Sequence, residues 1–237
     1  MSNSIEYITQ LLNAKRTGNH ESNIDWILTD SRSLCFAEET LFFALKTKRN
    51  DGHKYIPELY RKGVRNFVVS DLPQNVEEYA DTNFLQLESP LKGLQKLAGN
   101  HRSQFNVPVV GITGSNGKTV IKEWLYQLLS PERVVTRSPR SYNSQIGVPL
   151  SVWLMNESTE VGVFEAGISE MGEMEALQNM IRPTIGVLSN IGGAHQENFY
   201  SLQDKCMEKL SLFKDCDVVV YDGDNPLISS CISKFLF

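Results

Sequence analysis

Residues 107–129 read VPVVGITGSNGKTVIKEWLYQLL, which places an apolar stretch, a glycine-rich turn and a second apolar stretch in direct succession. The first apolar stretch, residues 107–112, predicts a buried strand. Residues 118–129 predict an amphipathic helix, and the apolar residues that recur on one face of it are Val120, Ile121, Trp124, Leu125, Leu128 and Leu129. A glycine-rich turn between a strand and a helix brings backbone N–H groups and the positive end of the helix close to an anion. The segment therefore predicts a phosphate-binding loop.

The turn itself reads TGSNGKT, and its expected nucleotide-binding residues are Thr113, Gly114, Ser115, Asn116, Gly117, Lys118 and Thr119. Lys118 would neutralise the β- and γ-phosphates, and the Thr119 hydroxyl would bind Mg²⁺. The loop departs from the common pattern G-x-x-x-x-G-K-[ST] because Ile112 stands where that pattern requires glycine. In the alternative interpretation the segment is an ordinary glycine turn, in which Lys118 lies on the surface and Thr119 caps the helix.

Composition favours a globular protein with small-molecule ligands. A chain of 237 residues with 41% hydrophobic residues can bury the core of one large or two modest domains, and we expect two. The formal net charge of -5 argues against a nucleic-acid or anionic-membrane partner. Because the sequence shows neither a basic leader before an apolar run nor an apolar stretch long enough to cross a bilayer, we expect a soluble cytoplasmic protein. The four cysteines have no metal-binding spacing and are expected to be reduced.

The order of apolar segments predicts an α/β fold with two domains, divided at residues 105/106. In the first domain strands are expected at 26–28, 41–45 and 67–69, and helices at 1–15, 55–62 and 90–102. Downstream of the loop, strands are expected at 161–164, 184–188 and 217–221, alternating with helices at 174–181 and 202–213. This βαβα alternation predicts a small α/β domain over residues 1–105 and a phosphate-loop-type, mostly parallel sheet with helices on both faces over residues 106–237.

Ligands of such sheets bind beyond the carboxyl ends of the strands, where the loop, Glu165 and residues 190–195 are expected to converge. Mg²⁺ prefers oxygen ligands and keeps several waters, so Thr119 and Glu165 beside the phosphates would suffice for a site. Glu165 could instead cap a nearby helix. His195 is a poor ligand for Mg²⁺ by its chemistry, and a single histidine in a loop is usually structural.

Lys209 lies on the apolar stripe of the helix expected at 202–213, together with Leu202, Cys206 and Phe213. A lysine on a buried stripe can extend its ammonium group to the surface. Alternatively, a desolvated lysine with a lowered pKa can react with CO₂ to give a carbamate whose oxygens bind a metal. The sequence pattern leaves both possibilities open.

The loop TGSNGKT, Glu165, the segment SNIGGAH at residues 189–195 and the downstream Lys209 together resemble the Mur ligases of peptidoglycan synthesis. The resemblance implies that the loop binds ATP and that Lys118 is catalytic. It implies that Thr119, Glu165 and His195 bind magnesium, with two ions in the site. It also implies that Lys209 is carbamylated and shares in metal binding and catalysis with His195.

Residues 141–149 and 164–167 are most similar to the branch of this family that adds D-alanyl-D-alanine to UDP-N-acetylmuramoyl-tripeptide. In that branch Asn143 matches a substrate-loop asparagine, whereas Ser144 stands where a second asparagine is more usual. The segments 30–32 and 41–46 resemble the family's UDP-binding domain, although residues 30–32 alone could be a solvated turn. The residues that the resemblance assigns to substrate are Ser31, Arg32, Lys46, Asn143, Ser144 and Asn190.

The implied reaction is ATP-dependent amide formation, in which the γ-phosphate moves to the substrate carboxylate and an amine then attacks the acyl phosphate. The chain is expected to be the N-terminal part of a longer ligase, with a truncated central domain and little activity alone. It also looks like ligases that are fused to a downstream alanine racemase. The alternatives are another Mur ligase, a folylpolyglutamate synthase-like ligase, or a nucleotide-binding module without catalysis.

Overall fold

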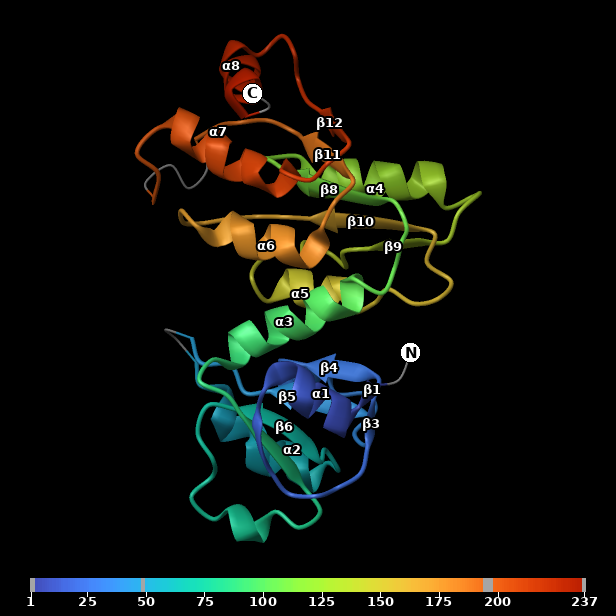
Figure 1. Cartoon of the computed structure of the whole chain (residues 1–237), viewed down its shortest axis with the longest axis vertical. Coiled ribbons are helices and arrows are strands. Elements are labelled where there is room, and N and C mark those ends of the chain that lie inside the picture. The colour runs from blue at the N-terminus through green and yellow to red at the C-terminus, as the bar shows by residue number, and fades with distance from the viewer. Residues whose placement is uncertain (1–2, 48–49, 194–197, 236–237) are drawn as a thin grey trace. The chain divides into compact units, whose positions relative to one another are not determined.

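The computed structural model describes residues 3–47, 50–193 and 198–235, and the chain divides into two compact units, Met1–Leu97 and Ala98–Phe237 (Figure 1). The division lies inside helix α3 (Pro90–Arg102), upstream of the boundary expected at residues 105/106. Each unit has its own sheet and its own hydrophobic core.

Unit 1 is a small α/β unit, as expected from the sequence. Its five-stranded sheet has the order β2 (Lys15–Thr17), β7 (Asn83–Gln86), β6 (Asn66–Val69), β5 (Thr40–Phe43) and β4 (Trp26–Leu28). All neighbours are parallel except β2, which pairs antiparallel with β7. The remaining elements are the paired strands β1 (Asn3–Ser4) and β3 (Asn23–Ile24), the helices α1 (Ile5–Leu12) and α2 (Ile56–Arg61), and the 3-10 turns η1 (Ser31–Ser33), η2 (Gly52–Tyr55) and η3 (Val76–Glu78).

Aromatic side chains hold the centre of unit 1. The ring of Phe67 on β6 stacks on that of Phe84 on β7 at 5.4 Å and meets the edge of Phe42 on β5 at 6.2 Å. All three rings are buried, and Ile56 and Leu59 of α2 complete the same cluster. Large buried aromatic rings dominate the energy of a small core. This packing fixes the carboxyl ends of β5 and β6, which are followed by the polar residues Lys46, Ser70 and Asp71.

Unit 2 contains the mostly parallel sheet that the βαβα order predicts. Its strand order is β12 (Val218–Val220), β11 (Ile185–Leu188), β8 (Val109–Thr113), β10 (Val161–Glu165) and β9 (Val135–Arg137), with every neighbouring pair parallel. Its helices are α4 (Lys118–Leu129), α5 (Gly147–Val152), α6 (Glu173–Ile181), α7 (Leu202–Leu210) with the 3-10 turn η5 (Ser211–Phe213), and α8 (Pro226–Phe235). The carboxyl ends of β10, β8 and β11 therefore lie side by side.

Helices cover both faces of this sheet, because side chains alternate along each strand. Val109 and Phe164 point into the larger core with α5, α6 and α7, whereas Val110, Ile112 and Val163 point towards α4. Only part of the apolar face expected for α4 is buried. Ile121 and Leu125 pack against the sheet, but the side chains of another set are exposed: Val120, Trp124 and Leu128.

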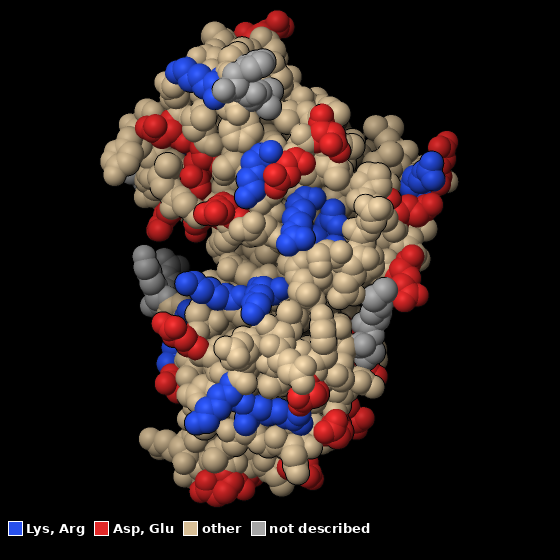
Figure 2. All heavy atoms as spheres, in the orientation of Figure 1, with Lys and Arg blue, Asp and Glu red and all other residues tan. Residues whose placement is uncertain are grey.

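Within residues 3–47, 50–193 and 198–235, no helix combines the length and the apolar composition needed to cross a bilayer. Clusters of basic and acidic side chains alternate over the face shown in Figure 2, so neither sign of charge dominates that face.

A buried arginine closes the end of α6. Arg102 is 5% exposed, and its guanidinium donates to the carbonyl oxygens of Ile181 (2.8 Å), Phe105 (2.7 Å) and Arg182 (3.2 Å). The last carbonyl groups of a helix have no partner within the helix, so they need such donors when they are buried. Arg102 thereby joins the end of α3 to the end of α6.

Replacing Arg102 by methionine is expected to lower the free energy of unfolding by about 2–3 kcal/mol, because buried carbonyl oxygens lose their donors. Lys96→Met, at an exposed position of the same helix, is expected to change stability by less than about 0.5 kcal/mol. Urea unfolding followed by tryptophan fluorescence measures both. A wild-type midpoint for Arg102→Met would contradict the role of these hydrogen bonds.

Candidate functional site

The loop after β8 has the backbone geometry that its sequence predicts. Strand β8 ends at Thr113 and helix α4 begins at Lys118. Two glycines have positive φ angles, +142° at Gly114 and +80° at Gly117, which L side chains rarely adopt. A Cβ atom at Gly114 would lie 1.9 Å from the Ser189 hydroxyl oxygen. Glycine is therefore required there both by the backbone conformation and by the close approach of the segment after β11.

That neighbouring segment holds the first half of the loop. The Ser115 N–H donates to the Asn190 carbonyl oxygen (2.9 Å), and the Asn116 N–H donates to the Asn190 side-chain oxygen (2.8 Å). The Gly192 N–H donates to the Ser115 hydroxyl (2.8 Å). Asn190, which the sequence assigned to substrate, thus lies against the loop and shapes it. The first N–H groups of a helix have no acceptor within it, so the start of α4 beside this loop suits an anion.

Two lysines that the sequence singled out line one pocket of about 150 Å³ at this edge of the sheet. Lys118 donates to the Gly114 carbonyl oxygen (2.7 Å), and burial lowers the pKa of its ammonium group. Lys209 enters the same pocket from α7. The lining also contains Asn143 and Ser144, both expected to bind substrate, so the structure brings these four residues together.

Lys209 is 3% exposed, so its ammonium group does not extend to the surface. Burial, with the charges of Lys118 and Lys205 nearby, lowers its pKa to about 7. Sequence reasoning missed Lys205, which is 1% exposed, lines the pocket and donates to the Gly192 carbonyl oxygen (2.6 Å). The signal was present, because residues 205 and 209 lie four apart on one helix and share a face.

Glu165 at the end of β10 is fully buried. Its Oε2 accepts a hydrogen bond from the Thr119 hydroxyl (3.0 Å) and contacts the Asn143 amide nitrogen (3.4 Å), so the two expected metal ligands meet. Its Oε1 lies 3.0 Å from Lys122 Nζ, but no hydrogen bond of good geometry from the described residues reaches that oxygen. A hydroxyl and a carboxylate with spare acceptor capacity form a donor set that suits Mg²⁺.

The described residues around Glu165 offer a metal ion oxygen ligands rather than a cluster of nitrogen or sulfur ligands. In the described part of the chain, no group of three or more His, Cys, Asp or Glu side chains is close enough to hold a metal ion. A site there would depend on oxygen atoms of a few residues, of the nucleotide and of water. His195, the further metal ligand expected from the resemblance, lies outside the described residues.

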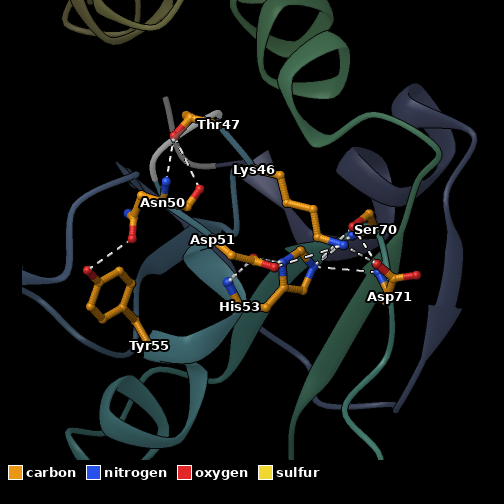
Figure 3. Close-up of polar contacts among 8 residues, drawn as sticks. All are labelled: Lys46, Thr47, Asn50, Asp51, His53, Tyr55, Ser70 and Asp71. Atoms are coloured by element: carbon orange, nitrogen blue, oxygen red, sulfur yellow. Dashed lines mark hydrogen bonds and ion pairs between the residues drawn. The ribbon is translucent and has the colours of Figure 1, made fainter.

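The residues of unit 1 expected to bind UDP follow two of its strands. Ser31 is buried in η1, and the exposed Arg32 pairs with Asp30 at 2.7 Å. Lys46 pairs with Asp71 at 2.5 Å, and this hydrogen bond raises the pKa of the lysine (Figure 3). Exposed ion pairs contribute little to stability, so both cations can exchange their carboxylate for a phosphate at small cost.

A histidine that sequence reasoning missed fixes the neighbouring loop. His53 Nδ1 lies 2.6 Å from the Asp51 carboxylate, while its Nε2 lies 3.1 Å from the Ser70 N–H and 3.3 Å from the Ser70 hydroxyl (Figure 3). The order serine, histidine, aspartate is that of a hydrolytic triad. Here, however, Nε2 accepts the backbone N–H and cannot also serve as a base. Through these contacts His53 therefore links η2 to the end of β6.

Phosphate-binding α/β domains carry such a glycine-rich loop at the carboxyl end of a parallel strand, and unit 2 is a domain of this class. The family model described as "Mur ligase middle domain" matches residues 112–235. The chain belongs to the Mur ligase family.

Curated relatives agree with this assignment. The UDP-N-acetylmuramoyl-tripeptide--D-alanyl-D-alanine ligase of Bacillus subtilis is 32% identical over 214 residues, covering 89% of this chain and 46% of the relative. The ligase of the same name from Synechocystis is 35% identical over 218 residues, covering 90% of this chain and 46% of the relative. The chain thus spans about half the length of the curated relatives it matches.

Solved structures show the same fold. MurF ligase from Thermotoga maritima, in complex with ADP, superimposes with a TM-score of 0.77 at 29% identity and covers 95% of this chain and 49% of that protein. MurF from Acinetobacter baumannii gives a TM-score of 0.84 at 24% identity and covers 98% of this chain and 52% of that protein. The expected α/β fold with its parallel-sheet domain is confirmed.

The stability of unit 2 is expected to rise with pH through Lys209. Its pKa is about 7 in the folded chain and 10.5 when unfolded, so between these values the unfolded chain binds more protons. In CO₂-free buffer the wild type should gain about 1.4 kcal/mol per pH unit over Lys209→Met in this window, and no further difference should appear below it. Denaturant unfolding at several pH values measures this. The control is Lys214→Met, an exposed position, and a wild-type slope retained in Lys209→Met would contradict the shift.

Replacing His53 by alanine is expected to remove the contact between η2 and Ser70 at the end of β6. The Ser70 N–H loses its acceptor, so its hydrogen exchange should accelerate, with a loss of about 1–2 kcal/mol in the stability of unit 1. Exchange monitored by NMR tests this. His20→Ala is the matched control, because the interactions shown for His20 use its carbonyl oxygen rather than its ring. An unchanged exchange rate at Ser70 would contradict the hydrogen bond from the Ser70 N–H to His53.

Proposed function

We propose that the chain supplies the nucleotide site and the UDP-substrate site of an ATP-dependent ligase that joins D-alanyl-D-alanine to UDP-N-acetylmuramoyl-tripeptide. Relatives of this name support the substrate class. The observation that carries the proposal is the pocket that holds Lys118 and Lys209 beside Asn143. A reaction that passes a phosphoryl group to a carboxylate needs such buried cations where negative charge develops.

The reaction proceeds in two steps. A carboxylate oxygen of the tripeptide attacks the γ-phosphorus of ATP, forming an acyl phosphate and releasing ADP. The amine of D-alanyl-D-alanine then attacks the acyl carbon, an amide forms, and phosphate and a proton leave. Lys118 binds the transferred phosphoryl group, and the loop residues Thr113 to Thr119 hold the nucleotide. Asn143 and Ser144 orient the substrate carboxylate, while Asn190 keeps the loop in shape beside it.

In this proposal the site holds two magnesium ions. Thr119 and Glu165 would hold one, and His195 with a carbamate on Lys209 would hold the other. When bound, the ions neutralise the charge of the phosphoryl group. The buried, partly deprotonated amine of Lys209 supports the carbamate, because only the neutral amine reacts with CO₂.

In this proposal residues 1–105 form the UDP-substrate-binding domain and residues 106–237 belong to the central ATP-binding domain. Ser31, Arg32 and Lys46 bind the UDP part of the substrate. The enzyme works in the cytoplasm, where ATP and the nucleotide precursor are present. A downstream alanine racemase domain in the full-length protein stays a prediction from the sequence alone.

Calorimetric titration of the chain tests the proposal. UDP-N-acetylmuramoyl-tripeptide and Mg·ADP are expected to bind, whereas a folate is expected not to bind, and UMP should bind more weakly than the full substrate. Lys118→Met should lose at least about tenfold in ADP affinity, because a charged contact to phosphate is removed. Folate binding without muramoyl-nucleotide binding would favour the folylpolyglutamate synthase-like alternative. Binding of ADP that is indifferent to Lys118→Met would contradict the assigned loop.

A further inference from the structure

Lys122 is a fully buried lysine on the first turns of α4 that the proposed reaction does not use. Its ammonium nitrogen lies 3.0 Å from Glu165 Oε1 and 3.1 Å from Glu123 Oε1, and it donates to the carbonyl oxygen of Arg140. Lysine is almost never fully buried unless it is paired. Removing one partner of a buried pair leaves an uncompensated charge, so Lys122 and Glu165 depend on each other.

The two oxygens of Glu165 have different surroundings. Oε1 faces Lys122, whereas Oε2 faces the Thr119 hydroxyl and the Asn143 amide. Lys122 and Thr119 are three residues apart on α4 and therefore lie on the same face of the helix. Helix α4 thus carries both Thr119, the expected hydroxyl ligand, and Lys122, the cation beside Oε1 of Glu165.

The second partner of Lys122 is weaker. Glu123 is 36% exposed in its side chain, and it also pairs with Arg137, whose guanidinium lies 3.9 Å from the centre of the Tyr126 ring. A partly exposed pair is screened by water and contributes less than a buried one. Glu123 therefore helps to hold Lys122, while Glu165 is the partner whose orientation Lys122 decides.

We propose that Lys122 is a positioning residue that keeps Glu165 a one-oxygen ligand and so selects Mg²⁺ over Ca²⁺. The inference rests on the proposed metal role of Glu165. Mg²⁺ takes single carboxylate oxygens in a compact octahedral shell, whereas Ca²⁺ readily takes both oxygens of one carboxylate. The ammonium group 3.0 Å from Oε1 opposes a second cation at that oxygen by its charge, which leaves Oε2 for the ion and disfavours a larger ion that would span both oxygens.

The test compares wild type with Lys122→Met in three titrations of the chain: ADP without metal, and Mg²⁺ and Ca²⁺ added to the ADP complex. Lys122→Met should lower the affinity of the ADP complex for Mg²⁺ by about 10–100-fold, the usual effect of losing a group that orients a metal ligand. The affinity for Ca²⁺ should be unchanged or higher, because the repelling charge beside Oε1 is gone, so the preference for Mg²⁺ falls at least about tenfold. Metal-free ADP affinity should stay within about twofold. Glu123→Gln, the control, should keep the wild-type preference.

The outcomes separate the inference from the proposed function. A wild-type chain that binds neither ADP nor metal overturns both. If the wild type binds them, a Lys122→Met variant with an unchanged preference, or with a parallel loss of metal-free ADP affinity, overturns the inference alone. Infrared difference spectra of the wild-type chain test it without any change at Lys122, with Glu165→Gln used to assign the carboxylate band. A one-oxygen signature with Mg²⁺ is expected, and a two-oxygen signature with Mg²⁺ overturns the inference.

Discussion

The hydrogen-bond register of β8 with its two neighbours determines where the candidate site residues of unit 2 lie. Glu165 pairs with Ile112, and Leu188 pairs with Thr113, so three strands end at the same level. A slip of one residue would turn every side chain to the other face of the sheet. Glu165 would then leave Thr119, and the Asn190 segment would no longer reach the loop. The buried valines and isoleucines on both faces of these strands are what prevent that slip.

The pocket beyond these strand ends is electrostatically unbalanced. Lys118, Lys205 and Lys209 line it together, and no carboxylate appears among its described lining residues. Burial is the main cause of the lowered pKa values of Lys118 and Lys209, and the charges of neighbouring lysines lower them further, so keeping these ammonium groups charged in the pocket costs stability. The neighbouring Glu165 is already matched by Lys122. An anion in this pocket would relieve the repulsion, so ligand binding and folding stability are coupled in this unit.

Much of this arrangement could be predicted from the sequence, because long periodic segments carry strong signals. Helices α3 and α4 occupy the residue ranges expected for them, and the strand ends at Glu165 and Leu188 were expected closely. Strands β2 and β9 were missed because their sequences, KRT and VTR, are short and mostly polar, whereas the equally short β4 and β12 are apolar throughout. The burial of Lys122 on α4 could not be predicted, because a lysine gives no sign of burial without its distant partner Glu165. The contact between His53 and Ser70 likewise depends on residues far apart in the chain.

The hydrogen bonds from the loop to Asn190 also bear on how a ligand would bind. Because the N–H groups of Ser115 and Asn116 are already bonded within the protein, this half of the loop has lost its conformational freedom before any nucleotide arrives. The entropy of ordering it is therefore part of the folding free energy and does not weaken binding. A nucleotide that binds as proposed would therefore meet residues 115 and 116 already ordered, and this half of the loop would not have to close before binding.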